Sequence, residues 1–341
     1  MLVFLVALVA VALLAGCGGD ADGDGVRHAT PETPTPITPT PTPIGATPTP
    51  PPTEFRVAFI NLHSPLLQDL GDDAVEETFN QRLQMILVEL RSFDPDVVGI
   101  NEAFRSTKFP DVLTTIGREL GMVPCFQRAN PWLPGQTRDQ SNALADQVGF
   151  EEGELILVRN TYQAVRPCER YVLQPLTTDS GEGRIGVHWV IKGPRSFGGD
   201  GEIDIFITHL KGGTDAVRAQ QALDFARWVA EKRGSGPSIV MAGQDDPTSA
   251  SNYDAYRAIG LRDVLTGEDV VTCCRVSVVG EQQPLTARND YLMYDRMQVI
   301  SAEFLGERPE PMPDGSLVYA SDHLGIKAVF AVPPERSGII P

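Results

Sequence analysis

Residues 201–247 constrain the fold more than any other stretch of the chain. From Ile203 to Ile207 every second residue is isoleucine, which predicts a strand with at least one buried face. Thr214 is suited to cap a helix after the break at Gly212 and Gly213, and residues 238–242 form a second short apolar run. Strand, helix and strand in this order are typical of α/β proteins.

Polar residues follow both of these strands. The first ends on Thr208 and His209, and the second is followed by Gln244, Asp245 and Asp246. Strand ends are where α/β architectures place chemistry. Taken alone, a surface histidine and an acidic turn explain this stretch as well as a functional site does.

The size and charge of the chain set further limits. A length of 341 residues is enough for one large domain or two ordinary ones. The formal net charge of −17 repels phosphate backbones, so tight non-specific binding of nucleic acid is disfavoured without a basic patch or metal ions. There is no internal repeat, and no change in composition after Thr53 marks a second domain.

The chain begins with an apolar, uncharged run over residues 1–14, and Leu14-Ala15-Gly16-Cys17 resembles the lipobox of bacterial lipoproteins. This resemblance implies a signal peptide over residues 1–16 and a lipidated Cys17 that anchors the protein to a membrane. No lysine or arginine precedes the run, as a signal peptide normally requires. An uncleaved anchor is the alternative, and it too places the domain outside the cytoplasm.

Residues 31–53 form a proline and threonine tract that cannot build a core. Such a tract favours extended polyproline II structure at ~3.1 Å per residue, so it spans roughly 70 Å as a stalk. The expected organisation is a linker over residues 17–53, a folded domain over 54–333 and a tail over 334–341.

Four cysteines lie in the folded domain: Cys125, Cys168, Cys273 and Cys274. They allow three pairings, and none has the spacing of a zinc site. Cys125 and Cys168 each lie in or beside a strand-like segment, so we predict that they are close enough to be bridged in an oxidising compartment. For the adjacent cysteines Cys273 and Cys274 the sequence does not decide between a disulfide and two free thiols.

The remaining elements follow from periodicity and breakers. Residues 130–149 are expected as a surface loop, and residues 270–279 as a strand pair or an irregular excursion. The other expected helices cover residues 76–93, 111–120 and 252–259. The other expected strands cover residues 55–60, 96–100, 122–128, 154–159, 171–176, 185–192, 289–294 and 325–332.

Polar residues at the expected strand ends form one set: Asn61, Glu102, His209, Asp245, Asp246, Asp290, Asp322 and His323. Two histidines, an isolated glutamate and several acids fit metal-assisted phosphoryl chemistry, because hard cations such as Mg²⁺ take oxygen ligands. An imidazole held by a carboxylate activates water or steadies a phosphoryl oxygen. Any one of these residues is more often a solvated strand end, so the weight comes from their order.

That order resembles the endonuclease/exonuclease/phosphatase superfamily, which includes DNase I-like nucleases, inositol phosphatases and bacterial sphingomyelinases. The resemblance covers most of residues 56–330 and includes a stretch ending in Glu102 that is close to the family's "pDvv.lqE". The other matching motifs are Phe206-Ile207-Thr208-His209-Leu210, Gly243-Gln244-Asp245-Asp246, Asn289-Asp290-Tyr291-Leu292 and Ser321-Asp322-His323. The resemblance implies an α/β fold, a two-sheet α/β sandwich of four layers (DNase I-like), with the site at one edge.

The resemblance also implies roles for individual residues. Glu102 is the expected main ligand of Mg²⁺, for which Mn²⁺ is a possible substitute, and Asn61 and Asp322 support metal and phosphate. His323, oriented by Asp290, contacts the phosphoryl group or activates water. On the other side of the phosphoryl group, His209 stabilises the departing oxygen or gives it a proton.

Three positions depart from the family pattern. The family's catalytic aspartate falls on Gln244 here, and its asparagine falls on Asp246. Because alternate residues of an extended segment share a face, Asp246 is the better candidate for a replacement base, and Gln244 is left to position substrate or water. Asn101 also stands where the family often has a glutamine.

The expected function is that of a metal-dependent phosphoric ester hydrolase, a phosphodiesterase or phosphatase, displayed outside the cytoplasm on a lipid anchor. The alternative is a catalytically impaired relative that acts as a binding module, because of Gln244. A solute-binding lipoprotein is disfavoured by the contexts of Glu102 and of Asp322-His323. The expected partners are a membrane, through Cys17, and a phosphoester: a lipid head group, a small organophosphate or a nucleic acid. No obligate protein partner is evident in the sequence.

Overall fold

The computed structural model describes residues 54–65, 73–131, 136–174, 184–193, 201–210, 214–244, 250–267, 270–281 and 284–331. The expected signal peptide, Cys17, the linker and the tail lie outside these residues, as do Asp245 and Asp246. Within the described ranges, no helix combines the length and apolar character needed to cross a bilayer.

The first large sheet has six strands in the order β13-β16-β1-β2-β4-β3. Its apolar strands are the ones that alternation and short apolar runs predict, and β1 is parallel to β2 but antiparallel to β16. The first strand of the domain therefore lies beside the last one. The bounds are β1 (Glu54–Asn61), β2 (Val97–Ser106), β3 (Met122–Asn130), β4 (Phe150–Arg159), β13 (Gln298–Leu305) and β16 (Gly325–Ala331).

The second sheet has seven strands and contains the strand-helix-strand unit with which the sequence analysis began. Strand β8 runs parallel to β9, and α6 (Asp215–Lys232) connects them, with Thr214 capping the helix through its side chain. The sheet order is β10-β12-β9-β8-β7-β5, with β6 paired to β7. The bounds are β5 (Gln163–Ala164), β6 (Glu169–Val172), β7 (Ile185–Lys192), β8 (Glu202–His209), β9 (Ser238–Gly243), β10 (Arg262–Asp263) and β12 (Asp290–Asp295).

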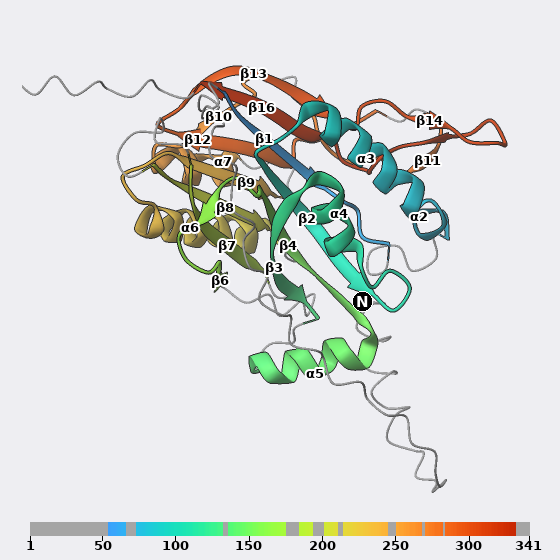
Figure 1. Ribbon diagram of the computed structural model, residues 1–341, viewed down its shortest axis with the longest axis horizontal. Coiled ribbons are helices and arrows are strands. Elements are labelled where there is room, and N and C mark those ends of the chain that lie inside the picture. Colours follow the sequence, from blue (N-terminus) through green and yellow to red (C-terminus); the bar gives the residue numbers. More distant parts are fainter. Residues whose placement is uncertain are drawn as a thin grey trace, which may run out of the picture. The chain divides into compact units, whose positions relative to one another are not determined.

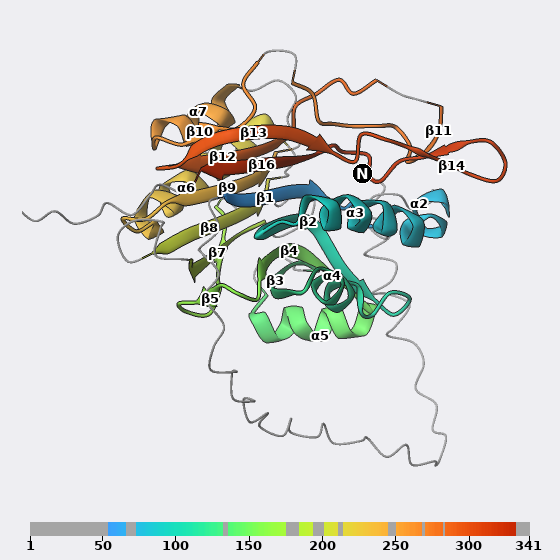
Figure 2. The same cartoon turned by 45° about the horizontal axis from the view of Figure 1, so that its top comes forward.

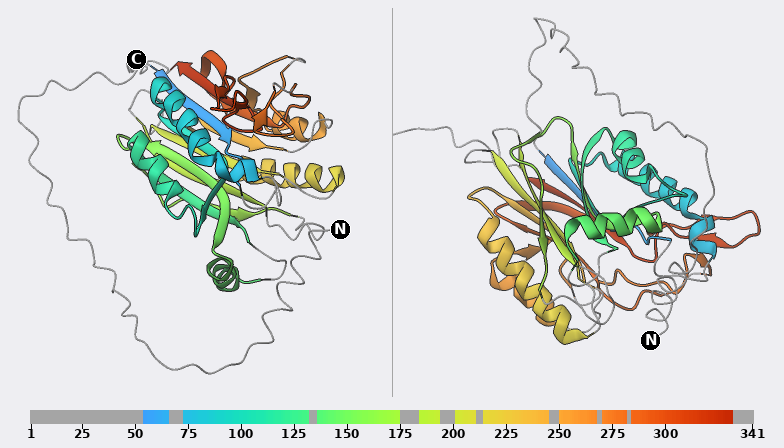
Figure 3. Two further views of the ribbon diagram at one scale, coloured as in Figure 1. Left: turned by 90° about the vertical axis from the view of Figure 1, so that its right-hand side faces the viewer. Right: turned by 90° about the horizontal axis from the view of Figure 1, so that it is seen from below.

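Helices cover the outer face of each sheet, which gives four layers (Figures 1 and 2). On the six-stranded sheet lie α3 (Phe79–Phe93) and α4 (Val112–Leu120), and on the seven-stranded sheet lie α6 and α7 (Ala250–Ala258). Figure 3 shows these two helical layers on opposite sides of the paired sheets. The four-layer α/β sandwich expected from the sequence is therefore confirmed. The shorter elements are α2 (Asp73–Glu77), α5 (Arg138–Val148), β11 (Val279–Gly280), β14 (Glu310–Pro311) and β15 (Leu317–Val318).

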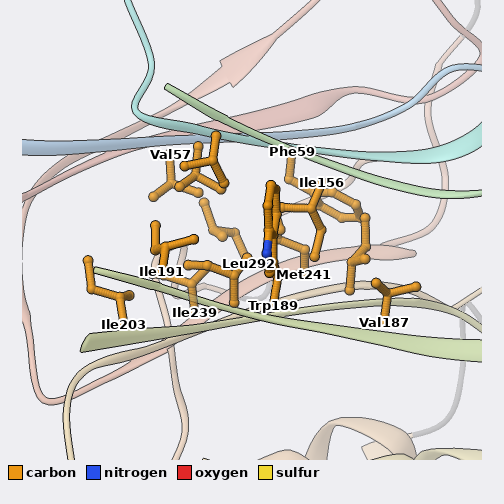
Figure 4. Close-up of a cluster of buried hydrophobic side chains, with 14 of the residues drawn as sticks. Val57, Phe59, Ile156, Val187, Trp189, Ile191, Ile203, Ile239, Met241 and Leu292 are labelled. Carbon is orange, nitrogen blue, oxygen red and sulfur yellow. The ribbon is translucent and has the colours of Figure 1, made fainter. Parts of the chain in front are cut away.

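A buried apolar core joins the inner faces of the two sheets (Figure 4). Phe59 from β1 and Ile156 from β4 belong to the same core as Ile203 and Met241 from the second sheet, and none of the four is exposed. Burying apolar surface at roughly 25 cal/mol per Å² makes this layer a main source of stability.

A disulfide also connects the two sheets. Cys125 lies on β3 of the first sheet and Cys168 directly before β6 of the second, and their Cα atoms are 6.3 Å apart. The predicted bridge between these two cysteines is confirmed.

The expectation that residues 130–149 form a loop is wrong, because α5 occupies much of this segment. Thr137 and Gln140 form a capping box at its start, and Gly149 ends it with a φ of 66°. The helix is largely exposed and has no apolar stripe, since Ser141 and Ala145 are its only buried side chains among those described. Hydrophobic periodicity therefore missed it.

Further elements differ from the expectation, among them β4, which begins at Phe150 and not at residue 154. The helix expected over residues 76–93 is interrupted at Thr78, which separates α2 from α3. Strand β2 does not end at residue 100 but continues through a bulge to Ser106. Strand β13 was not expected at all, because it lies at a sheet edge with mostly exposed and half-buried side chains.

Candidate functional site

Strand ends bring the candidate residues to one edge of the sandwich. Asn61 ends β1 and pairs in register with Asn101 of β2. His209 ends β8 opposite Gly243, which is also the partner of Asp290 at the start of β12. Asp322 and His323 come just before β16. Of the candidate residues in the domain, Asp245 and Asp246 lie outside the described part of the chain.

Glu102 lies in a β-bulge of β2 and has a φ of 53°, a left-handed conformation that is uncommon for a side chain of this size. Its Oε1 accepts a hydrogen bond from Asn61 Nδ2 (3.0 Å), and its Oε2 accepts one from the backbone N–H of Ser64 (3.0 Å). His209 Nδ1 lies 3.9 Å from Oε1. The bulge and these contacts fix a buried carboxylate at the edge of the sandwich. Strained backbone conformations of this kind cluster at functional sites.

Asn101 connects the two sheets beside Glu102. Its Nδ2 donates to the carbonyl oxygen of Thr208 on β8 (3.2 Å) and to the carboxylate of Glu154 on β4. The approach is close enough to require glycine on β9, because a Cβ on Gly243 would lie 2.5 Å from Asn101 Oδ1. The sheets are therefore held together at the edge where the candidate residues gather.

Glu154 was not singled out by the sequence analysis, although it begins the strand expected over residues 154–159. Its complete burial raises its pKa to about 7, while His209 and the hydrogen bond from Asn101 act in the opposite direction. No sequence signal marks this residue, because its burial depends on the packing of one sheet against the other.

Asp290 and His323 form a second pair. His323 Nδ1 lies 2.7 Å from Asp290 Oδ2, and both residues are buried. Thr272 Oγ1 accepts the backbone N–H groups of Asn289 and Asp290 (3.0 Å each), which fixes the start of β12. The carboxylate thus orients the imidazole, as the resemblance implies for these two residues.

His63 and Arg82 join the two pairs, and the sequence analysis assigned neither a role. The backbone N–H of His63 donates to Asn61 Oδ1 (2.9 Å), and His63 Nδ1 lies 3.3 Å from Asp322 Oδ1. Arg82 is fully buried and donates to the carbonyl oxygens of Leu62 and His63 (3.2 Å each) and of Ala320 (3.4 Å). One arginine therefore ties the segment after β1 to the segment that carries Asp322.

Gln244 is buried directly after β9. Its backbone N–H donates to the carbonyl oxygen of Asn289 (2.8 Å), so it lies beside Asp290. Within the described residues, its side-chain Nε2 has no hydrogen-bond partner, and neither has Asp290 Oδ1. Polar atoms buried in this way point to a ligand, a water or an adjacent segment.

Two adjacent cysteines cover the other ring nitrogen of His323. The structure joins Cys273 and Cys274 as a vicinal disulfide, and their sulfurs lie 3.4 and 3.6 Å from His323 Nε2. The segment expected over residues 270–279 is irregular, with a single bridge between Cys273 and Ala287. The sequence shows the adjacent cysteines but not their contact with His323, which arises only when the two segments pack together.

The residues around Glu102 fit a hard divalent cation. Glu102 is a buried carboxylate, and the Asn61 side chain and the Ser64 backbone that donate to it are both neutral. A carboxylate with amide oxygens nearby suits Mg²⁺, which binds one or two carboxylates and keeps several waters.

Comparisons with known proteins identify the fold. No family model matches the sequence, and a search of the curated proteins finds no match. Among solved structures, the human Nocturnin catalytic domain with bound sulfate shares 19% identity at a TM-score of 0.57, covering 82% of this chain and 94% of that one. A Bacteroides thetaiotaomicron mannosyl-6-phosphatase shares 17% identity at a TM-score of 0.58, covering 80% and 98%.

A third structure, an endonuclease/exonuclease/phosphatase family protein from Bacteroides thetaiotaomicron, shares 18% identity at a TM-score of 0.60. The match covers 82% of this chain and 98% of that one. At these identities the likeness establishes the fold. The described residues between 54 and 331 therefore share the fold of these endonuclease/exonuclease/phosphatase structures, the DNase I-like α/β sandwich.

Proposed function

We propose that the protein is a divalent-metal-dependent phosphoric ester hydrolase, a phosphodiesterase or phosphatase. The observation that carries the proposal is the meeting of two buried pairs at one sheet edge. Glu102 with Asn61 supplies an oxygen-rich anion, and Asp290 with His323 supplies an oriented imidazole. A mannosyl-6-phosphatase has the same fold, which supports a phosphoric ester as substrate.

Glu102 would hold Mg²⁺ or Mn²⁺, with Asn61 and Asp322 nearby, and the ion would neutralise charge on the phosphoryl oxygens. In the hydrolysis, the water oxygen forms a bond to phosphorus and the ester P–O bond breaks. His323 contacts the phosphoryl group or accepts the water proton, and Asp290 holds its ring in place. His209 stabilises the departing oxygen or gives it a proton.

The alternative is a catalytically impaired binding module. Gln244 favours it, because a neutral amide cannot accept the proton that an aspartate at this place accepts. Under this alternative the protein still binds a phosphoester or phosphate at the same edge but does not turn it over.

The test is hydrolysis of bis(4-nitrophenyl) phosphate and 4-nitrophenyl phosphate by the full chain, with Mg²⁺, with Mn²⁺ and with EDTA. We expect turnover of at least one ester, its loss in EDTA and its recovery when Mg²⁺ is added back. Glu303→Gln removes an exposed carboxylate on β13 and is the matched control for Glu102→Gln. Turnover that is equal with and without EDTA would contradict metal dependence.

The natural substrate class follows less directly from the residues. The net charge of −17 disfavours long duplex DNA and leaves lipid head groups, small organophosphates and short nucleic acids. Turnover of a phosphocholine ester, a sugar phosphate and a short oligonucleotide under the same conditions separates these three.

We also propose that the domain is displayed outside the cytoplasm through a lipidated Cys17, on the basis of the sequence motif alone. Mass spectrometry of membrane fractions should find no peptide from residues 1–16, and Cys17→Ala should move the protein out of the membrane fraction. Equal membrane association of the variant would count against lipidation.

A further inference from the structure

The Cys273-Cys274 pair lies against His323 on the side away from Asp290. We propose that, once the disulfide is reduced, Cys273, Cys274 and His323 form a binding site for a soft or borderline metal ion of the Zn²⁺, Cd²⁺ or Cu⁺ class. Nothing in the expected magnesium chemistry at Glu102 uses these two sulfurs. Thiolates select soft metals, whereas carboxylate and amide oxygens select hard ones.

The spacing of the donor atoms supports this proposal. His323 Nε2 lies 3.4 Å from Cys273 Sγ and 3.6 Å from Cys274 Sγ, while the two sulfurs are joined to each other and must move apart after reduction. A tetrahedral zinc ion with Zn–S bonds of about 2.3 Å and Zn–N bonds of about 2.0 Å separates sulfur from nitrogen by about 3.5 Å. Both nitrogen-to-sulfur distances are therefore near those of a bound ion before any metal arrives.

Asp290 prepares the histidine for the same task. Its contact with Nδ1 at 2.7 Å places the ring proton on that nitrogen, so the lone pair of Nε2 faces the sulfurs. Histidines that bind metals commonly donate their other ring N–H to a carboxylate, which fixes the tautomer and strengthens the ligand. The catalytic assignment of His323 does not require the two cysteines, so their placement is a separate observation.

The backbone around the cysteines is held on both sides. Thr272 O accepts the N–H of Leu324 (2.7 Å), and the N–H of Arg275 donates to the carbonyl oxygen of Asp322 (2.9 Å). The Arg275 guanidinium also donates to the carbonyl oxygen of Ser321 (2.8 Å). The cysteine segment and the His323 segment are therefore held against each other, and Cys274 is exposed, which leaves the site open to ions from solvent.

The chemistry balances with a phosphine as reductant. The phosphine and one water deliver two electrons and two protons to the disulfide, which gives two thiols and a phosphine oxide. A divalent ion then forms two metal–sulfur bonds, releases both thiol protons to solvent and accepts the Nε2 lone pair. A solvent molecule fills the fourth position.

The consequence for activity depends on the proposed function. An ion on Nε2 removes the atom with which His323 would contact a phosphoryl group or accept a proton, so the soft metal inhibits hydrolysis. The binding itself does not depend on that function, and the two are measured separately.

Binding is tested by titrating the phosphine-reduced full chain with Cd²⁺ after the phosphine is removed, and following the ultraviolet charge-transfer band of the cadmium–thiolate bond. The matched control is Cys273→Ser/Cys274→Ser, which keeps Cys17, Cys125 and Cys168. We expect one cadmium ion more per wild-type chain than per variant chain, and no such difference when neither protein is reduced. Asp290→Asn should weaken this extra site by roughly 10- to 100-fold.

Three outcomes would overturn the site. The first is an equal cadmium count in the wild type and the double serine variant. The second is a cadmium affinity, read from the charge-transfer band, that is the same in His323→Ala as in the wild type, since the histidine is the proposed third ligand. The third is a cadmium site that disappears in Glu102→Gln, which would place the ion among the oxygen ligands.

The effect on activity is measured as the rate of hydrolysis with Zn²⁺ divided by the rate without it, for each reduced protein separately. The ratio should fall at least 10-fold further in the wild type than in the double serine variant. Equal ratios together with a confirmed cadmium site would leave the metal site standing and remove the role of His323 in hydrolysis.

Discussion

The two ends of the candidate site differ in what holds them and in which atoms they offer. Around Glu102 the strands β1 and β2 present carboxylate and amide oxygens, and a bulge and three sheet contacts fix them. Around His323 two loop segments present nitrogen and sulfur, tied together by Thr272 and Arg275. The comparison teaches that one sheet edge presents oxygen atoms held by strands beside nitrogen and sulfur atoms held by loops, and that the end at His323 carries a disulfide whereas the end at Glu102 has carboxylate and amide groups.

Removing the carboxylate should break the oxygen-rich end alone. For Glu102→Gln we expect metal-dependent hydrolysis to fall by about 10³-fold or more, because the charge that holds Mg²⁺ is lost. The circular dichroism spectrum and the cadmium band of the reduced protein should not change. Unchanged turnover at limiting Mg²⁺ would remove Glu102 from the metal site.

The positions after β9 sharpen the view of the oxygen-rich end. The resembled family has its catalytic aspartate at the position of Gln244. If Asp246 serves as the base instead, then Asp246→Asn should lower the rate by roughly 10²- to 10⁴-fold. Gln244→Asp/Asp246→Asn should then restore it, both measured at saturating Mg²⁺. An inactive wild type with an active double variant would instead favour the binding module.

Asp290→Asn affects the His323 end through the orientation of the imidazole. We expect kcat to fall by about 10²-fold with little change in KM, and the pH–rate profile to shift, because the imidazolium loses its carboxylate partner. The double variant Asp290→Asn/His323→Ala should have nearly the same kcat as His323→Ala alone, since both residues act through one imidazole ring. Additive losses would mean that Asp290 acts independently of His323.

Glu154→Gln tests the packing behind the oxygen-rich end and affects stability rather than turnover. Burial raises the pKa of Glu154 in the folded protein from its ordinary value of 4.5 to about 7, so the folded protein holds the proton more tightly than the unfolded chain. The contribution of this group is therefore fully present below about pH 4.5 and is lost as pH rises to about 7, by at most about 3 kcal/mol.

Urea denaturation in EDTA at pH 5 and pH 8 measures this effect. The free energy of unfolding of the wild type should fall more between the two pH values than that of Glu154→Gln, whose amide keeps a hydrogen-bonding oxygen for Asn101. Parallel pH profiles would show that Glu154 is ionised in the folded protein throughout this range.

Sequence periodicity predicted most strands and the positions of Asn61, His209 and Asp290, because each follows or begins a short apolar run. It did not predict the bulge at Glu102, since a bulge depends on the register with β4 and not on the strand itself. The contact between His63 and Asp322 and the burial of Glu154 arise only when distant segments pack. The polar helix α5 had no apolar stripe to reveal it.

The pairing of β1 with β16 sets the order in which the molecule can be completed during translation. The ribosome delivers β1 first, but one of its edges has no partner until Ala331 has emerged. Asp322 and His323 emerge only a few residues earlier, so a nascent chain cannot assemble the site before its last strand is available. Until then β1 has one edge whose backbone N–H and C=O groups lack their strand partner, the kind of edge through which incomplete sheets pair with other chains.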